Sequence, residues 1–414
     1  MNDCSTAALV RRAASEYLGL APLARLSING ADLQAVAHGL LQQAAADGDN
    51  AVLWMNLATA LFACGLPEQG QAVQAQALAM VRSYRIAARQ PPARLRVLML
   101  MAPGDLAENT PLDCLLEASP EIELICHFSC PEAPLPEPLP AHDVLLVALS
   151  DTVSGQPIRA RLTPLLRHWP KPVINRPEHI PNTERRRASE RLQGVPGLLM
   201  PHTRAVSRAD LADLAAGGRE VGALCPDCRF PIILRPLGSQ AGRDLARLED
   251  ADAVARYLAR VAGEDFYLSR FVDYSGADGR FRKARVALVD GVPYACHMAV
   301  SSHWMVHYVN AGMYEDAAKR AEEAAFEADF AVFARRHAAA LAAIHQRIGL
   351  DYVCIDCAET RDGQLLVFEV DHVMVVHAMD SPEVFPYKQV HMGKVRRALE
   401  RYLRACATPV AEPC

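Results

Sequence analysis

Hydrophobic positions recur every three to four residues through the first part of the chain. Trp54, Leu57 and Leu61 have helical spacing, and Gly65 fits a helix stop. A second helix is predicted over 67–83. We expect residues 1–90 to be helical throughout.

After Gln90 the pattern changes to short apolar runs. Residues 97–101, 143–150 and 171–175 are typical of buried parallel strands, with helical stretches between them. The proline-rich segment 130–140 is expected to be irregular. The pattern therefore predicts an α/β unit that covers roughly residues 95–180.

From about residue 205 the strands come with tight turn signals. Residues 284–299 predict a hairpin around Asp290-Gly291, and residues 352–371 predict another around Asp362-Gly363. A long helix is expected over 315–348, ending at Gly349.

The fold class is therefore α/β (α+β), and its length of 414 residues suggests two to four folding units. We expect a helical segment over 1–90, an α/β domain over 95–205 and a third domain over 206–405.

Composition narrows the class of protein. A net charge of -5 and a pI near 6.3 give no electrostatic reason to expect nucleic-acid binding. No apolar run is long enough to span a membrane, and no signal peptide is recognisable at the start. Twelve cysteines are too few for a disulfide scaffold, so we expect a soluble, reduced, cytoplasmic protein.

Three acidic residues stand out in the last predicted hairpin. If Asp362-Gly363 is a two-residue turn, Asp356 lies directly opposite Glu369, and Asp371 lies on the same face. Like charges so close together, among apolar neighbours, repel. A hard cation such as Mg²⁺ would resolve the conflict, so we interpret the three as metal ligands.

The residues around this hairpin resemble the ATP-grasp superfamily, which includes glutathione synthetase, D-alanine–D-alanine ligase and RimK-type ligases. The family's last strand pair reads roughly Gly-x-Asp, then Gly-x-x-x-x-x-Glu-x-Asn, and here it runs from Gly349 to Asp356 and from Gly363 to Asp371. Asp371 stands where the family has Asn. The resemblance implies ATP and Mg²⁺ as cofactors, a domain before the ATP-grasp fold over 95–205 and the ATP-grasp domain itself over 206–405.

A second block, Phe230–Gly242, resembles the family's strand ending in Lys-Pro and its glycine-rich loop. Arg235 replaces the lysine and keeps a charge that can bind phosphate. By the resemblance, the loop closes over ATP. The loop residues expected to contact ATP are Gly238, Ser239, Gln240 and Gly242.

Further blocks resemble the family more loosely. Phe271 and Val272 stand where main-chain groups of the hinge hold adenine, although Arg270 replaces a usual Glu or Gln. The first phosphate-binding lysine should lie within 175–187. That segment contains arginines instead. Arg186 and Arg187 are the candidates for the phosphate-binding role, together with Arg185.

Arg285 and the residues after it resemble a family strand whose arginine faces the transferred phosphate or the substrate. Strand alternation puts Lys283 and Arg285 on one face and His297 on the other, so His297 is expected in the core. Arg285 and Asn310 are the catalytic candidates. The candidates for substrate binding are Lys283, His303, His307, His372 and His377.

Cysteine pairs occur at Cys225/Cys228 and Cys354/Cys357. A shared zinc site is disfavoured because the second pair would point to opposite faces of a strand. Redox activity of the first pair and inert thiols both stay open.

The resemblance implies a carboxylate–amine ligase that forms an amide or peptide bond through an acylphosphate. Its substrate would be an amino acid, a peptide or a small carboxylic acid. An inactive ATP-binding scaffold or sensor and a phosphotransferase on the same fold remain alternatives. Residues 1–90 resemble a degenerate tetratricopeptide hairpin, which suggests a protein partner, although a plain helical appendage is equally open; a homodimer is also left open.

Overall fold

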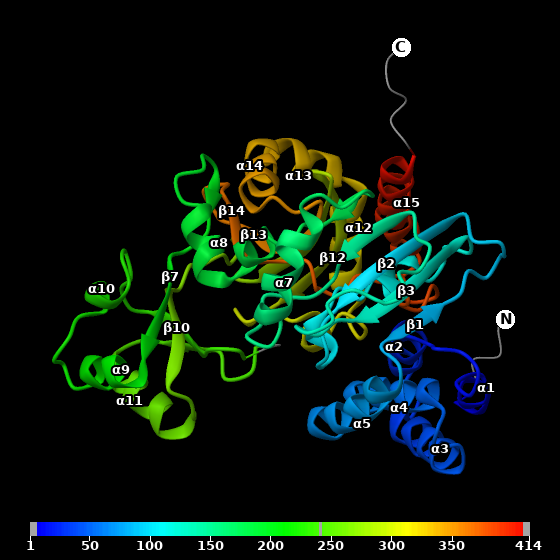
Figure 1. Ribbon diagram of the computed structural model, residues 1–414. Helices are drawn as coiled ribbons and strands as arrows, with labels where there is room; N and C mark the ends of the chain where they lie inside the picture. The colour runs from blue at the N-terminus through cyan, green and yellow to red at the C-terminus, as the bar shows by residue number, and fades with distance from the viewer. Residues whose placement is uncertain (1–5, 240–241, 409–414) are drawn as a thin grey trace.

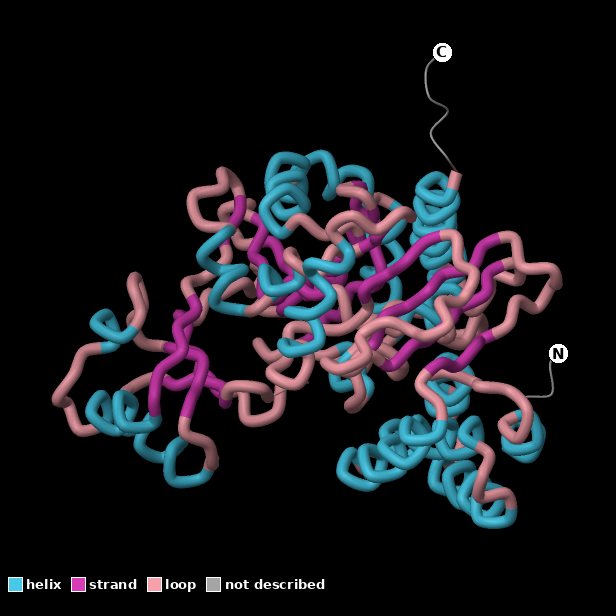
Figure 2. Tube along the Cα trace, viewed as in Figure 1, coloured by secondary structure: helices cyan, strands magenta, loops and turns pink. Residues whose placement is uncertain are grey.

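The computed structural model describes residues 6–239 and 242–408, and Figure 1 shows their arrangement. The chain is α/β, as predicted, with a helical unit at the N-terminus and three β-sheets. Two larger sheets lie side by side in the body of the molecule, and a smaller sheet stands apart at one end (Figure 2).

The N-terminal unit is a small helical bundle with its own hydrophobic core. Asp32 and Asn50 begin two of its helices by accepting hydrogen bonds from backbone N–H groups of the first turn. The helices are α1 (Thr6–Arg12), α2 (Ala21–Ile28), α3 (Leu33–Ala46), α4 (Ala51–Ala63) and α5 (Pro67–Met80).

The helical prediction up to residue 90 is wrong at its end, because β1 (Ser83–Ile86) follows α5. This strand pairs antiparallel with β3 of the first sheet. Tyr84 is buried against Phe128, and its hydroxyl donates to the carbonyl of Ala77. These tertiary contacts select a strand where local pattern alone gave no sign of one.

The first sheet has the order β1-β3-β2-β4-β5, and all pairs except β1–β3 are parallel. The three predicted strands are confirmed, but the prediction missed β3, whose apolar run of seven residues periodicity cannot tell from a buried helix. The elements are β2 (Leu95–Met101), η1 (Leu106–Glu108), α6 (Leu112–Leu116), β3 (Ile122–Phe128), β4 (Val144–Val147), α7 (Gln156–Leu166) and β5 (Val173–Ile174).

A short connection leads from this sheet to the third one. It contains η2 (Ile180–Thr183), α8 (Arg185–Arg191) and β6 (Leu198–Leu199). Although β6 lies within the range predicted for the first α/β domain, it pairs in parallel with β14 at the edge of the third sheet.

The second sheet is small and antiparallel, with the order β7-β10-β8-β9. Three helices cover it and share a separate core with it. The elements are β7 (Thr203–Ser207), α9 (Arg208–Ala215), α10 (Val221–Leu224), β8 (Ile232–Pro236), β9 (Ala246–Leu248), α11 (Ala251–Arg260) and β10 (Asp265–Arg270).

The third sheet has the order β12-β11-β13-β14-β6. Its residues share two hydrophobic clusters with the first sheet, so the two sheets and their helices form one body. The elements are β11 (Phe281–Val289), β12 (Val292–Ser301), η3 (Tyr308–Asn310), α12 (Ala317–Ala328), α13 (Phe330–Arg336), α14 (Ala338–Ile348), β13 (Tyr352–Glu359), β14 (Leu365–Asp371) and α15 (Lys388–Ala407).

The long helix predicted over 315–348 is three helices. The backbone leaves helical geometry at Asp329 and at His337. His337 is buried and its Nε2 lies 2.8 Å from the Glu359 carboxylate, a contact that a continuous helix pattern does not reveal. The predicted stop at Gly349 is confirmed by its positive φ of 79°.

The β11–β12 hairpin turns at Asp290-Gly291, as predicted. Both residues have positive φ, and Val289 pairs with Val292 across the turn. Further along, the register shifts because Cys296 is an extra residue in β12. The shift pairs His297 directly with Arg285, which turns His297 onto the face opposite to the one predicted.

The β13–β14 hairpin reaches the predicted register by a different route. Its loop has three residues instead of two, since Thr360 N–H donates to the carbonyl of Gln364 and Gly363 N–H donates to the carbonyl of Thr360. Phe368 is an extra, bulged residue in β14, and it shifts the pairing by one residue back to the predicted register. The pairing of Asp356 with Glu369 is therefore confirmed, although the turn length was wrong.

Candidate functional site

A cleft of about 430 Å³ lies between the second and third sheets. Strands β8 and β10 form one wall, and strands β11, β13 and β14 form the other. Charged side chains reach it from both walls and from α8. They are Arg185, Arg235, Arg270, Lys283, Arg285, Asp356, Glu369 and Asp371.

Asp356 lies at the floor of the cleft and is only 3% exposed. Lys283 Nζ and Arg285 Nε each donate to its carboxylate over 2.8 Å. Burial alone would raise the pKa of Asp356, but the charges of Arg285 and Lys283 outweigh it and hold that pKa well below its usual range. Asp356 is therefore an ionised, fully paired carboxylate.

Glu369 accepts a hydrogen bond from Arg185 of α8. Asp371 lies two residues further along β14, and burial followed by the negative charge of Glu369 raises its pKa to about 7. Repulsion between like charges therefore remains between Glu369 and Asp371.

The sequence pattern predicts that a metal ion supplies the balancing positive charge. In the structure, protein side chains supply part of that charge. Lys283 and Arg285 neutralise Asp356, and Arg185 neutralises Glu369. Among residues 6–239 and 242–408, no group of three His, Cys, Asp or Glu side chains is close enough to hold a metal ion. Glu369 and Asp371 still fit a cation, because a positive charge between them would relieve the repulsion that raises the pKa of Asp371.

Arg235 on β8 is 8% exposed and faces the cleft. Burial, followed by the nearby charge of Arg185, lowers its pKa to about 10. Its guanidinium donates to the carbonyl and to the hydroxyl of Ser239 at the start of the glycine-rich loop. Arg235 of β8 and Arg185 of α8 therefore lie close together, and the negative charge around them does not balance their two positive charges. This arrangement favours the binding of an anion.

Of the three consecutive arginines, Arg185 is the one that lines the cleft. The side chains of Arg186 and Arg187 are exposed on α8, where Glu184 accepts hydrogen bonds from their backbone N–H groups. The first turn of the helix therefore fixes which arginine faces inward, a detail that composition could not give.

The glycine-rich loop approaches the cleft from the small sheet. Gly238 and Gly242 have φ values of 74° and 72°, and Gly242 lines the cleft. A Cβ at Gly242 would lie 2.8 Å from His307 Nε2, so a side chain there would require the His307 ring to shift. Gln240 lies outside the described residues.

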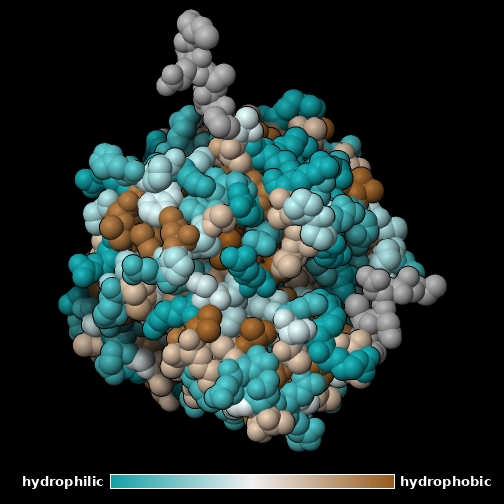
Figure 3. All heavy atoms as spheres, turned by 45° about the vertical axis from the view of Figure 1, so that its right-hand side comes forward, coloured by the Kyte–Doolittle hydropathy of each residue, from teal (hydrophilic) through white to brown (hydrophobic). Residues whose placement is uncertain are grey.

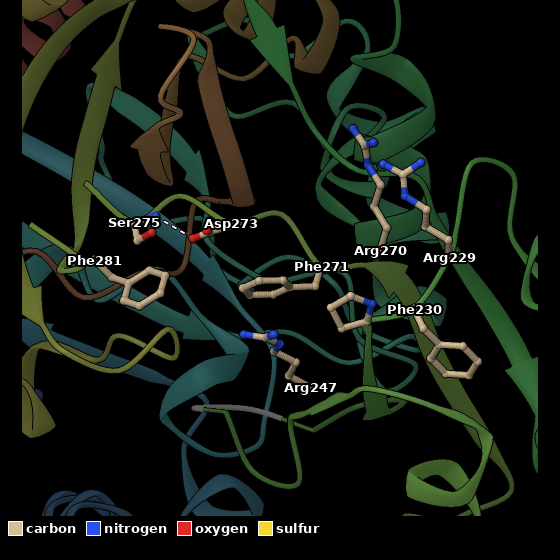
Figure 4. A pocket seen from close by; sticks show the side chains of 10 residues that line it. Arg229, Phe230, Arg247, Arg270, Phe271, Asp273, Ser275 and Phe281 are labelled. Atoms are coloured by element: carbon tan, nitrogen blue, oxygen red, sulfur yellow. Dashed lines mark hydrogen bonds between the residues drawn. The ribbon is translucent and has the colours of Figure 1, made fainter. Parts of the chain in front are cut away.

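The hinge after β10 borders two cavities. Phe271 and Val272 line the cleft, and Phe271 also lines a second pocket of about 400 Å³. In that pocket Arg247 lies over the Phe271 ring at 4.2 Å. Arg229 and Arg270 also line this pocket, and their side chains run roughly parallel to each other (Figure 4).

The structure brings some of the proposed substrate-binding residues to the cleft and leaves others away from it. Lys283 and His307 line it, together with Trp304 and Met305 from the same segment as His307. Burial and then the charge of Lys283 lower the pKa of His307.

The other candidates do not line the cleft. Asn310 is exposed, and its Oδ1 accepts from the backbone N–H of His307. His372 is fully buried, with its Nε2 3.1 Å from the carbonyl of Leu149. His303 and His377 do not line the cleft, and the ring nitrogen Nδ1 of each accepts from a backbone N–H two residues ahead.

His297 corrects the expectation of a core histidine. The Cys296 bulge places it beside Arg285 on the cleft side of the sheet, 4.9 Å from the ring of Tyr308. Burial, followed by the charge of Arg285, lowers its pKa well below the usual range, so it is a neutral imidazole. A bulge leaves no local pattern in a single sequence, which is why this residue was placed on the wrong face.

The cysteine pairs lie away from this cleft. Cys354 and Cys357 point to opposite faces of β13, as predicted, and belong to different hydrophobic clusters. Cys225 and Cys228 are both buried and free. A hydrogen bond between the two thiols lowers the pKa of Cys225 and raises that of Cys228.

The fold and the cleft define an α/β protein in which two largely antiparallel sheets enclose a densely charged site. Neither a protein-family model nor a curated protein matches the sequence. In the described part of the chain, no helix has the length and apolar character needed to cross a bilayer. On the face shown in Figure 3, hydrophilic residues predominate and hydrophobic ones form small separate patches.

The chain is similar to several solved structures, three of which follow. A RimK domain ATP-grasp protein from Sphaerobacter thermophilus DSM 20745 is 18% identical, over 72% of this chain and 98% of that one, with a TM-score of 0.39. D-alanine–D-alanine ligase from Bacillus anthracis, complexed with ATP, is 13% identical over 75% and 98%, with a TM-score of 0.43. The ATP-grasp ligase PsnB, with its precursor peptide PsnA2 and AMPPNP, is 13% identical over 76% and 99%, with a TM-score of 0.41.

Proposed function

We propose that this chain is an ATP- and Mg²⁺-dependent ligase that joins a carboxylate to an amine through an acylphosphate. The observation that carries the proposal is the arrangement of charge in the cleft. Arginines from α8 and β8 lie close together there, and the nearby negative charge does not balance them. The sheet on the opposite side of the cleft carries three carboxylates. A polyphosphate with a bound divalent cation complements both walls.

In this proposal Arg185 and Arg235 bind the phosphates of ATP. Phe271 and Val272 lie where the hinge would hold the adenine ring, and the loop that carries Gly242 covers the phosphates. Protein groups contribute mainly by positioning the reactants and by neutralising charge.

The reaction has two steps. A carboxylate oxygen of the substrate attacks the γ-phosphorus, the bond to the β–γ bridging oxygen breaks, and ADP leaves. The amine nitrogen then attacks the acyl carbon, inorganic phosphate leaves, and the amine loses a proton. In this proposal Arg285 and Lys283 stabilise the transferred phosphoryl group.

Glu369 and Asp371 would hold Mg²⁺, which would supply charge neutralisation at the phosphates. Asp356 can join them only by exchanging Lys283 or Arg285, to which it is bound. This pairing is a specific observation in favour of a second candidate, an ATP-binding sensor or scaffold without turnover. A phosphotransferase on the same fold would differ from the ligase in its product.

The two neighbouring arginines of α8 provide a matched test. Arg185→Ala should weaken binding of Mg·ATP by roughly 10–100-fold, since a hydrogen bond to a charged group contributes about 1.5–3 kcal/mol. Arg186→Ala removes the same charge one residue away, outside the cleft, and should bind like wild type. Isothermal titration calorimetry measures both; equal affinities in the two variants would refute the assignment.

Turnover separates the candidate functions. The full chain is incubated with Mg·ATP and pools of amino acids and peptides, and ADP release is followed with Asp371→Ala as the inactive control. Amide products seen by mass spectrometry support the ligase, and phosphorylated products indicate the phosphotransferase. Tight Mg·ATP binding without turnover on any pool would favour the sensor.

A further inference from the structure

A separate pocket of about 400 Å³ lies between the start of β12, the junction of α12 and α13, and the beginning of α15. None of its lining residues lines the cleft described above. Its walls are mostly apolar. They include Val292, Pro293, Tyr294, Ala295, Phe330 and Ala331.

Glu327 of α12 lines this pocket and is 1% exposed. Neither of its carboxylate oxygens has a hydrogen-bond partner among the described residues. A buried polar group without a partner costs about 1–3 kcal/mol, and more when it is charged. Unpartnered buried carboxyl groups are rare in native folds, so that of Glu327 requires an explanation.

The preceding turn of the same helix shows what a satisfied carboxylate looks like here. Glu323 is fully buried, and its oxygens accept from the backbone N–H of Met298 and from the hydroxyls of Tyr308 and Tyr387. The contrast shows that the fold can supply donors at this depth, yet it supplies none to Glu327.

The charges around Glu327 come from every neighbouring element. Burial raises its pKa to about 8, and the charge of Glu323 adds to the effect, as does Asp380 more weakly, while Lys388 and Lys394 oppose it. The remaining titratable groups near it or along the pocket are Tyr294 and Cys296 of β12, Arg335 of α13, and Tyr387 and His391 at the start of α15.

The pocket thus combines an acidic floor, apolar walls and a cationic rim formed by Arg335 and Lys394, both exposed. Both oxygens of Glu327 are covered in this structure, so its carboxylate must turn toward the pocket to accept from an ammonium group. An apolar body then fits against Phe330 and Tyr294, and a carboxylate can accept from the rim. We propose that this pocket binds a small amine that also carries a carboxylate, of which an amino acid with a hydrophobic side chain is the simplest example.

Proton release gives the proposal a distinctive signature. Below pH 8 the carboxyl of Glu327 is protonated in the free protein, but it must be ionised to pair with an ammonium group. Binding then expels a proton, so the affinity should rise about tenfold for each pH unit between roughly 6.5 and 7.5, and level off above 8.

Three probes of one shape test the recognition by calorimetry on the full chain. They are L-phenylalanine, 2-phenylethylamine, which lacks the carboxylate, and 3-phenylpropionate, which lacks the amine. We expect L-phenylalanine to bind most tightly and 3-phenylpropionate most weakly. Absence of binding by all three at millimolar concentration, or tighter binding of 3-phenylpropionate than of 2-phenylethylamine, would overturn the proposal.

Variants assign the contacts. Glu327→Gln, once its circular dichroism and melting show a folded chain, should bind L-phenylalanine about 10–100-fold more weakly and without pH dependence. Lys394→Met should weaken L-phenylalanine but spare 2-phenylethylamine. Arg397→Met removes a cation three residues along the same helix, outside the pocket, and should change neither; wild-type behaviour of Glu327→Gln would refute the site.

Discussion

Individual side chains in the cleft show what residue types alone can predict. The sequence identified Lys283, Arg285, Asp356 and Glu369 as functional candidates, and the structure places all four in one cleft. It could not show that Asp356 is already paired with Lys283 and Arg285, because that contact depends on the register between β11 and β13, two strands far apart in the chain. Arg185 was hidden among three equivalent arginines for a similar reason, since only the helix start decides which one faces inward.

Glu327 should make the protein less stable as pH rises. The unfolded chain releases this proton above a pKa of about 4.5, whereas the folded chain keeps it up to about 8. Stability is therefore lost progressively between these values, by about 1.4 kcal/mol for each pH unit. Glu327→Gln removes this loss, so its advantage over wild type should grow by about 2 kcal/mol between pH 6.0 and 7.5.

Urea unfolding at the two pH values measures this difference. Glu315→Gln, which neutralises an exposed carboxylate shortly before the same helix, is the matched control and should show no comparable growth. A constant difference between Glu327→Gln and wild type would contradict the raised pKa.

At the scale of elements, the strands with strong local signals were predicted well and the irregularities were not. The turn at Asp290-Gly291 and the stop at Gly349 are confirmed because their backbone demands specific residues. The bulges at Cys296 and Phe368 arise from packing across the sheet, so no single-sequence pattern indicates them. In one hairpin the bulge hid an error in turn length, and in the other it reversed the face of His297.

The three-residue loop of the β13–β14 hairpin depends on Gly363. Its φ is 81°, and nothing lies within 4 Å of a Cβ built there. Gly363→Ala should therefore cost about 1–2 kcal/mol through backbone conformation alone. Gly363→Asn should cost less, because Asn tolerates the left-handed region.

Thermal melting of the two variants checks the ranking. If Gly363→Ala were as stable as wild type, or less harmful than Gly363→Asn, the loop geometry assigned to this hairpin would be wrong.

At the scale of the whole molecule, hydrogen bonds and an ion pair attach the N-terminal helical unit to the domain of the first sheet. The carboxylate of Asp113 on α6 accepts from the N–H groups of Leu20 and Ala21 at the start of α2, and Arg25 pairs with Glu117. The helical unit also has a hydrophobic core of its own. Which surface it would pack on was not predictable, because its partner residues lie about ninety positions away.

Asp113→Ala should loosen this attachment without affecting the cleft. The two N–H groups would lose their acceptor, a change comparable to loss of a helix cap, which costs about 0.5–2 kcal/mol. Hydrogen exchange should accelerate in α2, while Mg·ATP affinity stays at the wild-type value.

Asp113→Asn keeps a carbonyl acceptor at the same position and serves as the control, with exchange close to wild type. Unchanged exchange in Asp113→Ala would show that the unit is held by its hydrophobic contacts alone.

The pairing of β6 with β14 has a further consequence for engineering. The chain leaves the body just after β6, at Leu199, builds the small sheet, and returns at Phe281 in β11. Leu199 and Phe281 belong to the same hydrophobic cluster. The small sheet is thus an insertion whose two ends pack against the same hydrophobic cluster, so we expect that it can be excised and bridged by a linker while both sheets of the body keep all their strands.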